Sequence, residues 1–343
     1  MAVSSTTYPR KWNSGKTTVI RVPEKLADDL LHIARQIDDS SSYLIRQDGD
    51  TLVLEMLSAK QVTYSSKKPI NVASVPQRSP FRYPGGKTWL IPYIRDWLRS
   101  KRAKPSRFLE PFAGGAEVSM TVGFERLAKH ILFSEIDPGV AAVWKVVLNG
   151  HVEWLAKKIT GFPLSVENAR AVLDSKAADL RDLAFQTILR NRVQRGGIMA
   201  PGAGLVKTGE NGRGINSRWY PETLARRIRE INYHKDCFSF LEADAFKVIA
   251  EHQEDTDTCF YVDPPYTVAA KRLYVAWDVD HERLFSDMAK CKGDFLMSYD
   301  NTSEVVRMAE KHGFEAMPVA MKSTHHAKMN ELLIGRDLSW VQV

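Results

Sequence analysis

The chain has 343 residues, a formal net charge of +7, 44% hydrophobic residues and 26% charged residues. This composition is typical of a soluble globular protein with one large domain and a small accessory one. No apolar run approaches the ~18 residues of a membrane span, and the polar N-terminus lacks the apolar core of a signal peptide. Cys237, Cys259 and Cys291 form neither a zinc pattern nor a disulfide framework, so we expect a reduced, cytoplasmic setting without a metal.

The positive charge is concentrated in residues 181–235, which carry eleven Lys or Arg against four Asp or Glu. The excess of seven in this segment equals that of the whole chain. A basic segment of this kind indicates a polyanionic partner, and an ordinary solvated surface is the alternative.

The first 75 residues predict a small accessory module followed by a linker. Thr17–Val22 alternate as a strand does, and a helix is expected to begin at Pro23. Ser42–Arg46 and Thr51–Leu57 flank a turn that contains Asp-Gly, which predicts a β-hairpin.

From residue 80 onward, short apolar strands alternate with amphipathic helices. This alternation predicts an α/β domain over residues 76–343, with a largely parallel sheet covered on both faces. Residues 151–235 break the rhythm with helical patterns around a glycine-rich patch, so we expect an inserted helical subdomain there. The expected strands are Arg107–Glu110, His130–Ser134, Phe238–Leu241, Cys259–Val262, Asp294–Ser298 and Glu331–Ile334.

The strand over residues 259–262 leads directly into Asp263-Pro264-Pro265-Tyr266. Ligands of open α/β sheets bind at the carboxyl ends of strands, so catalytic groups are expected here. The Asp263 carboxylate and the Pro264 carbonyl offer two acceptors for the N–H groups of an aromatic amine. Tyr266 offers a flat face on which an extruded base can stack. A simple surface turn is the alternative.

Two earlier strand ends predict a cofactor site. Phe112-Ala113-Gly114-Gly115-Ala116 forms a glycine turn without the phosphate-binding pattern of nucleotide loops. Glu135 follows about twenty residues later, where dinucleotide-binding folds place an acid that accepts the ribose hydroxyls. S-adenosylmethionine has a ribose and no pyrophosphate, so it fits both features. We expect Asp137 to cap the helix that Pro138 opens.

Two weaker elements extend this site. Asp244 follows another strand and is expected either to accept from the adenine amine of the cofactor or to cap a helix. Gly85 and Gly86 expose N–H groups at a helix start beside Lys87. These groups are expected to bind the carboxylate at the methionine end of the cofactor.

The chain resembles the Dam-type DNA adenine methyltransferases over roughly residues 79–335. The matching segments are Phe81 to Lys87, Glu110 to Val118, Glu135, Asp263 to Tyr266, and the late strand Asn330 to Leu333. The resemblance implies a Rossmann-like methyltransferase sheet, S-adenosyl-L-methionine as donor, double-stranded DNA as partner, and methyl transfer to N6 of a flipped adenine. The expected cofactor-binding residues are Tyr83, Gly86, Lys87, Glu110, Phe112, Gly114, Glu135, Asp244 and Asp263.

This chain departs from the family pattern in two places. The usual Phe-x-Gly-x-Gly turn is Phe112-Ala113-Gly114-Gly115-Ala116 here, so a different backbone path is expected. Residues 191–197 are a diverged form of the family's Asn-Arg-His-Gly-Tyr-Asn-Gly segment, so the GATC target cannot be carried over. The expected DNA-binding residues are Arg190, Arg192, Arg195, Lys207 and Arg213.

Two other readings stay open. An amino-methyltransferase acting on cytosine or on RNA would use the same motifs, although the cytosine enzymes usually carry Ser-Pro-Pro-Tyr. A DNA-binding regulator with an inactive methyltransferase fold is the alternative from another class. It would bind DNA through residues 1–75.

Overall fold

The computed structural model describes residues 75–82, 86–199, 203–265, 278–322 and 328–341, the strands β1 (Tyr43–Asp48) and β2 (Thr51–Met56), and three isolated residues. The chain divides into two compact units, Met1–Thr63 and Tyr64–Val343. The strand expected over residues 17–22, most of the helix expected after it, Tyr83 and Tyr266 lie outside the described residues.

The expected hairpin in the first unit is confirmed. Strands β1 and β2 pair antiparallel, in a register that runs from Tyr43 opposite Met56 to Asp48 opposite Thr51. Strand β1 therefore extends two residues further, to Asp48, than the sequence pattern predicted, whereas β2 begins at Thr51 as predicted.

The second unit is built on a seven-stranded sheet in the order β5-β4-β3-β6-β7-β9-β8. The first five strands in this order run parallel, whereas β9 is antiparallel to both of its neighbours. The bounds are β3 Arg107–Glu110, β4 His130–Glu135, β5 Phe238–Glu242, β6 Thr258–Val262, β7 Asp294–Asp300, β8 Glu315–Lys322 and β9 Lys328–Gly335. The predicted α/β class is confirmed, and so are all six predicted strands.

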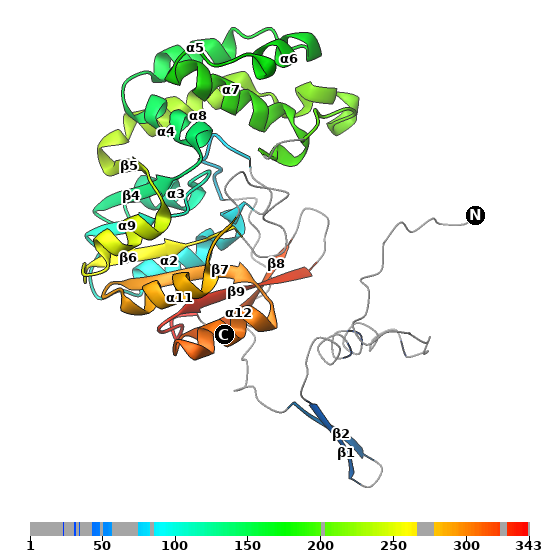
Figure 1. Cartoon of the computed structure of the whole chain (residues 1–343), viewed down its shortest axis with the longest axis vertical. Helices are drawn as coiled ribbons and strands as arrows, with labels where there is room; N and C mark the ends of the chain where they lie inside the picture. The colour runs from blue at the N-terminus through cyan, green and yellow to red at the C-terminus, as the bar shows by residue number, and fades with distance from the viewer. Residues whose placement is uncertain are drawn as a thin grey trace. The chain divides into compact units, whose positions relative to one another are not determined.

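Helices cover both faces of this sheet (Figure 1). The helices outside the insertion are α2 Ile91–Arg99, α3 Glu117–Phe124, α4 Pro138–Leu148, α9 Ala245–His252, α11 His281–Lys290 and α12 Ser303–Lys311. The helices between α4 and β5 are α5 Val152–Thr160, α6 Val166–Asp174, α7 Leu180–Val193 and α8 Pro221–Tyr233. The 3-10 turns are η2 Lys87–Leu90, η3 Arg195–Gly197, η4 Glu210–Gly212, η5 Gly214–Arg218 and η6 Lys235–Cys237.

Alternating residues of the strands supply two separate cores. In β6, Cys259 and Tyr261 pack in one core with α2, α3 and α4, whereas Phe260 and Val262 pack in the other with α9, α11 and α12. This period of two is the geometry of a strand buried on both faces. It explains why the strands read as continuous apolar runs in the sequence.

Strand β8 was not among the predicted strands, because Pro318 interrupts its apolar run. Proline lacks the N–H that an interior strand donates to its neighbours, and it is tolerated at a sheet edge. Here β8 pairs only with β9 and forms the edge of the sheet, and Pro318 lies opposite Leu332. The edge position therefore accommodates the proline.

The segment of residues 78–82, within the second unit, is bound by three helices. The Glu117 carboxylate at the start of α3 accepts the backbone N–H groups of Arg78 and Ser79 at 2.8–3.1 Å. Asn191 of α7 accepts from the Arg82 N–H at 2.8 Å and donates to the Arg82 carbonyl at 2.7 Å. Arg227 of α8 donates to the Ser79 carbonyl at 3.2 Å.

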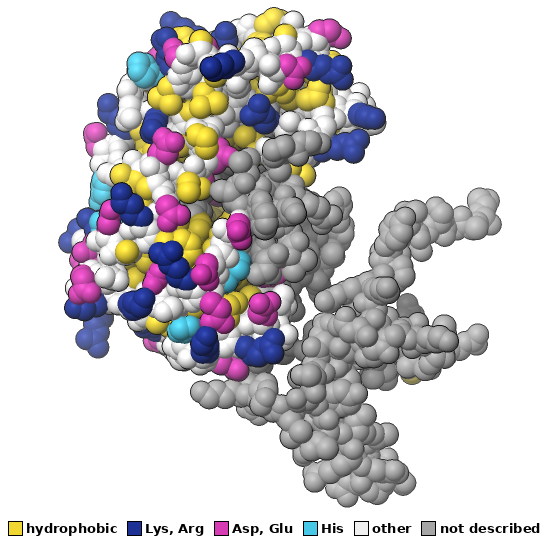
Figure 2. All heavy atoms as spheres, viewed as in Figure 1, with side chains coloured by type: hydrophobic (Ala, Val, Ile, Leu, Met, Phe, Trp, Pro, Cys, Tyr) yellow, Lys and Arg dark blue, Asp and Glu magenta, His cyan; other side chains and the backbone are white. Residues whose placement is uncertain are grey.

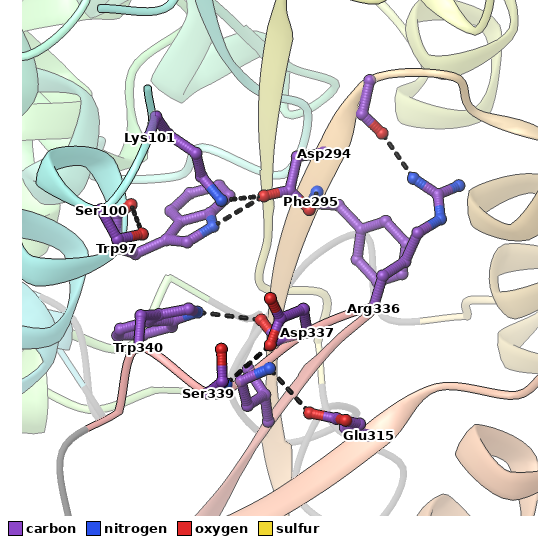
Figure 3. A network of polar contacts seen from close by, with 12 residues as sticks. Trp97, Ser100, Lys101, Asp294, Phe295, Glu315, Arg336, Asp337, Ser339 and Trp340 are labelled. Carbon is purple, nitrogen blue, oxygen red and sulfur yellow. Dashed lines mark hydrogen bonds and ion pairs between the residues drawn. The ribbon is translucent and has the colours of Figure 1, made fainter. Parts of the chain in front are cut away.

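A polar network closes the opposite end of the sheet from the carboxyl ends of the parallel strands (Figure 3). Asp294, the first residue of β7, accepts from the Trp97 indole N–H at 3.1 Å and pairs with the Lys101 ammonium. Arg336 follows β9, lies over the Phe295 ring at 4.9 Å, and donates to the carbonyls of Gly293 and Cys291. The arginine thus satisfies carbonyl groups that follow α11 and secures the turn into β7.

Replacing Arg336 with methionine is expected to lower the free energy of unfolding by about 1–3 kcal/mol, because buried carbonyl groups lose their donor. Methionine retains much of the aliphatic packing, so the loss reports mainly on the hydrogen bonds. Chemical denaturation monitored by circular dichroism measures the change. An Arg336→Met protein as stable as the wild type would contradict a role for these bonds.

Candidate active site

The topology of the sheet has a switch point between β3 and β6. From β3 the chain proceeds through β4 to β5 on one side, and β6 then returns to the other side of β3. At such a switch point the loops that follow neighbouring strands diverge and leave room for a ligand. Glu110 ends β3, and Asp263 directly follows the last residue of β6.

The Asp263 carboxylate is held on one oxygen by two donors. Its Oδ1 atom lies 3.3 Å from the Lys87 ammonium and accepts from the Ser298 hydroxyl at 2.9 Å. Tyr261 OH lies 2.9 Å from the same serine oxygen. Because the serine proton is used on Asp263, the tyrosine must donate. This series of hydrogen bonds, from Tyr261 through Ser298, fixes the rotation of the Asp263 carboxylate at the end of β6.

Lys87 is only 7% exposed, and its ammonium also lies 2.8 Å from Glu331 of β9. Burial lowers the pKa of Lys87, but the carboxylates of Asp263 and Glu331 outweigh burial and raise it. From the sequence, the Lys87 ammonium was expected to lie beside the glycine N–H groups and bind the cofactor's carboxylate. In the structure this ammonium pairs with two carboxylates of the protein, those of Asp263 and Glu331.

The glycine turn after β3 has a left-handed backbone at two positions. Gly114 has φ 48°, and Ala116 has φ 49° at the position where the family pattern has its second glycine. A left-handed alanine is strained by about 1–2 kcal/mol. The different backbone path expected from the shifted glycines stays a prediction. The Trp144 indole, which donates to the Gly114 carbonyl at 2.9 Å, holds the turn against α4.

Glu135 ends β4 with its carboxylate folded over the neighbouring turns. It accepts the N–H groups of Gly114 at 2.9 Å and of Ile136 and Asp137 at 2.8 Å. Burial raises the pKa of Glu135 to about 7, while these N–H donors oppose the rise. Asp137 accepts from the N–H groups of Gly139 and Val140, so the predicted helix cap is confirmed.

If Glu135 binds ribose hydroxyls, cofactor affinity is expected to fall below pH 7. A hydroxyl donates to the ionised carboxylate, and protonation removes the acceptor, so the dissociation constant rises up to about tenfold per pH unit below a pKa of about 7. Calorimetric titration from pH 5.5 to 8.5 measures this slope. Glu135→Gln is the control and should bind weakly at every pH; a wild-type affinity that is constant over this range would exclude the role.

Glu110 and Asp244 occupy two further strand ends. Glu110 is 3% exposed and accepts from the Ser119 N–H at 2.8 Å, and burial raises its pKa to about 8. Asp244 accepts from the Lys247 N–H at 3.2 Å and therefore caps α9, the second of the two roles considered for it. Phe112 and Phe246 meet edge to face nearby, with ring centroids 6.3 Å apart.

Residues 83–194, which include Lys87, the glycine turn, Glu135 and Asn191, match the family model of the D12 class N6 adenine-specific DNA methyltransferases. A D12 class methyltransferase domain is thus detected at residues 83–194. The protein is thus a methyltransferase, and S-adenosyl-L-methionine is its cofactor.

Among solved structures, the methyltransferase resembles a SAM-dependent methyltransferase from Agrobacterium tumefaciens, at 6% identity and TM-score 0.34, with 86% of this chain and 70% of that chain covered. It also resembles the rRNA methyltransferase AviRa from Streptomyces viridochromogenes, at 11% identity and TM-score 0.39, with 81% and 98% covered. No curated protein matches the chain. Within the described ranges, no helix is long and apolar enough to cross a membrane, and no cluster of metal-binding side chains occurs.

The methyltransferase domain carries most of its Lys and Arg excess on the helical insertion, and Figure 2 shows such side chains over its outer end. A cavity of about 370 Å³ opens between α7 and the segment before α8. Five of its lining residues are cationic, and Glu210, which pairs with one of them, is the single acidic residue that lines it. The cationic lining residues are Arg82, Arg192, Arg195, Lys207 and Arg218.

Arg192, one of the predicted DNA contacts, is buried although it lines the cavity. Only 4% of it is exposed, and its guanidinium donates to the Pro80 carbonyl. Burial, together with the neighbouring Arg227, Arg82 and Arg218, lowers its pKa to about 9. The sequence pattern missed this because an arginine near the end of a helix reads as exposed.

The other predicted DNA contacts are more accessible. Arg195 and Lys207 are exposed and line the cavity. Arg190 is half-buried and Arg213 is exposed; Arg213 lies 5.6 Å above the Tyr220 ring, and neither lines the cavity.

Sequence reasoning assigned no role to Glu331, Ser298 or Tyr261, which complete the Asp263 cluster. Glu331 lies in β9 directly before the apolar run Leu332–Ile334, and an acid buried in a sheet is almost always paired. That signal was available in the sequence. Ser298 and Tyr261 carried no such signal, because a hydroxyl-bearing residue inside a strand is usually only part of the packing.

Proposed function

We propose that this protein is a DNA methyltransferase that modifies the N6 atom of adenine. The observation that supports it most is the Asp263 carboxylate, fixed by Lys87 and Ser298 at the carboxyl end of β6. Its family match, to the D12 class N6 adenine-specific DNA methyltransferases, favours the same target.

Asp263 and the Pro264 carbonyl are proposed to accept the two N–H bonds of the target amine. An aromatic amine is a poor nucleophile because its lone pair is delocalised into the ring. Two acceptors favour a pyramidal nitrogen whose lone pair points at the methyl donor. Asp263 also stabilises the positive charge that develops on nitrogen and is the nearest base for the released proton. Tyr266 is proposed to stack on the base.

The described residues fit a cofactor that carries a sulfonium and an ammonium group. Glu110, Glu135 and Asp263 bring carboxyl groups to three neighbouring strand ends, and Phe112 and Phe246 add an aromatic wall. Glu135 is proposed to hold the ribose and Gly114 to leave room for the methionine portion. When bound, S-adenosyl-L-methionine supplies an electrophilic methyl group, which leaves its bonding electrons on sulfur as the new N–C bond forms.

DNA is proposed to bind along the helical insertion. The basic cavity holds four more cations than acids among its lining residues, which favours a polyanion. Arg195 and Lys207 are proposed as phosphate contacts, whereas Arg192 shapes the cavity floor from its buried position. Double-stranded DNA is the proposed partner, because a base flipped out of the duplex presents its amine to Asp263.

Mass spectrometry of nucleosides from unmethylated DNA, after incubation with the protein and S-adenosyl-L-methionine, tests this function. We expect N6-methyladenine. N4-methylcytosine would contradict the target atom, and methylation of RNA alone would contradict the substrate. An absence of any methylated nucleoside, with DNA still bound by residues 1–75, would favour the regulator instead.

A further inference from the structure

Glu331 is a buried acid that does not border the proposed base-binding loop in sequence, and the proposed reaction gives it no role. It is 6% exposed and lies in β9, directly opposite Asp300 of β7. Its carboxylate reaches the Lys87 ammonium at 2.8 Å, closer than the 3.3 Å between that ammonium and Asp263. Lys87 is thus shared unequally between two acids.

This sharing changes what Lys87 does to Asp263. A lysine paired with one carboxylate alone would sit tightly on it and weaken it as an acceptor for an incoming amine. Glu331 draws the ammonium to its own side, and Ser298 supplies the second donor to the same Asp263 oxygen. Lys87, Asp263 and Glu331 together carry one excess negative charge, which suits a site that receives a cationic methyl donor.

We propose that Glu331 is a positioning residue that acts through Lys87 to set the orientation and acceptor strength of Asp263. The proposal rests on the role of Asp263 in the proposed function. It predicts an effect on the rate of methyl transfer without a matching effect on cofactor binding, since Glu331 contacts a group beside the amine site.

A purely structural role is the rival explanation. A buried lysine needs a counter-charge, and its loss would destabilise the fold and reduce every activity together. The two explanations differ in whether Glu331 matters when Lys87 is absent. A residue that acts only through Lys87 loses its effect on the rate once Lys87 is replaced.

The test is a double-mutant cycle in the full chain with Glu331→Gln, Lys87→Met and the combined variant. Single-turnover methyl transfer, with the methyl group of the cofactor labelled, gives rates for slow variants as well. We expect Glu331→Gln to slow transfer about 10–100-fold, with the cofactor dissociation constant within about threefold of wild type. In the Lys87→Met background, Glu331→Gln should change the rate by less than about threefold.

Asp294→Asn is the matched control, because Asp294 holds the Lys101 ammonium at the start of β7, away from the site. It should leave the transfer rate near that of wild type. Equal slowing by Glu331→Gln in both backgrounds, or slowing matched by a loss of cofactor binding and thermal stability, would overturn the proposal. The rates are measured on whichever base the wild type methylates, so an unexpected base contradicts the proposed function without deciding the role of Glu331.

Discussion

Asp263→Ala is expected to slow methyl transfer by about 10²–10⁴-fold while the cofactor still binds. The carboxylate is the proposed acceptor at the end of β6, and its removal would leave the target amine without the group proposed to align its lone pair. Single-turnover transfer of labelled methyl groups to DNA gives the rate. Calorimetry with S-adenosyl-L-methionine gives the affinity.

Asp263→Asn is the informative companion, because it keeps the shape of the side chain and removes the negative charge. It should be slowed nearly as much as the alanine variant if the charge stabilises the developing cation. A fully active asparagine variant would limit the role of Asp263 to geometry. An alanine variant within a few-fold of wild type would exclude the proposed mechanism.

The double variant Arg195→Glu, Lys207→Glu is expected to bind DNA about 10–100-fold more weakly near physiological salt. Each lost phosphate contact reduces the slope of log affinity against log salt by about one. Fluorescence anisotropy with a labelled duplex at several salt concentrations measures both quantities. Cofactor affinity should be unchanged, since neither side chain lies at the strand ends that are proposed to hold the cofactor.

Arg226→Glu is the matched control for this charge reversal. It lies on α8 in the same insertion, its side chain is 69% exposed, and it does not line the cavity. A similar loss of affinity in the control would show that net charge, rather than the cavity, governs binding. An unaltered salt slope in the double variant would place the DNA elsewhere on the protein.

Much of the fold was predictable because each parallel strand is buried on both faces and reads as an apolar run with a turn after it. The acids and glycines at the strand ends were predictable for the same reason. Pro318 concealed β8, since the rule that excludes proline from strands does not hold at a sheet edge.

Side-chain partners were harder to predict than side-chain positions. Lys87 was expected to bind the cofactor's carboxylate beside the glycines, whereas its pairing with Asp263 and Glu331 joins residues far apart in the chain. Arg192 was assigned to DNA from its charge alone, whereas its burial depends on how residues 78–82 cross α7. Such contacts between distant segments leave no local signal.

The anchoring of residues 78–82 limits how the helical insertion, the proposed recognition region, can be exchanged. Asn191, Arg192 and Arg227 belong to the insertion, yet they hold the segment that leads to Lys87. A chimaera that replaced α5 to α8 as a block would loosen the lysine of the catalytic cluster unless it kept these three side chains. New target sequences are therefore more accessible through changes in the turns between α7 and α8 than through transfer of the whole subdomain.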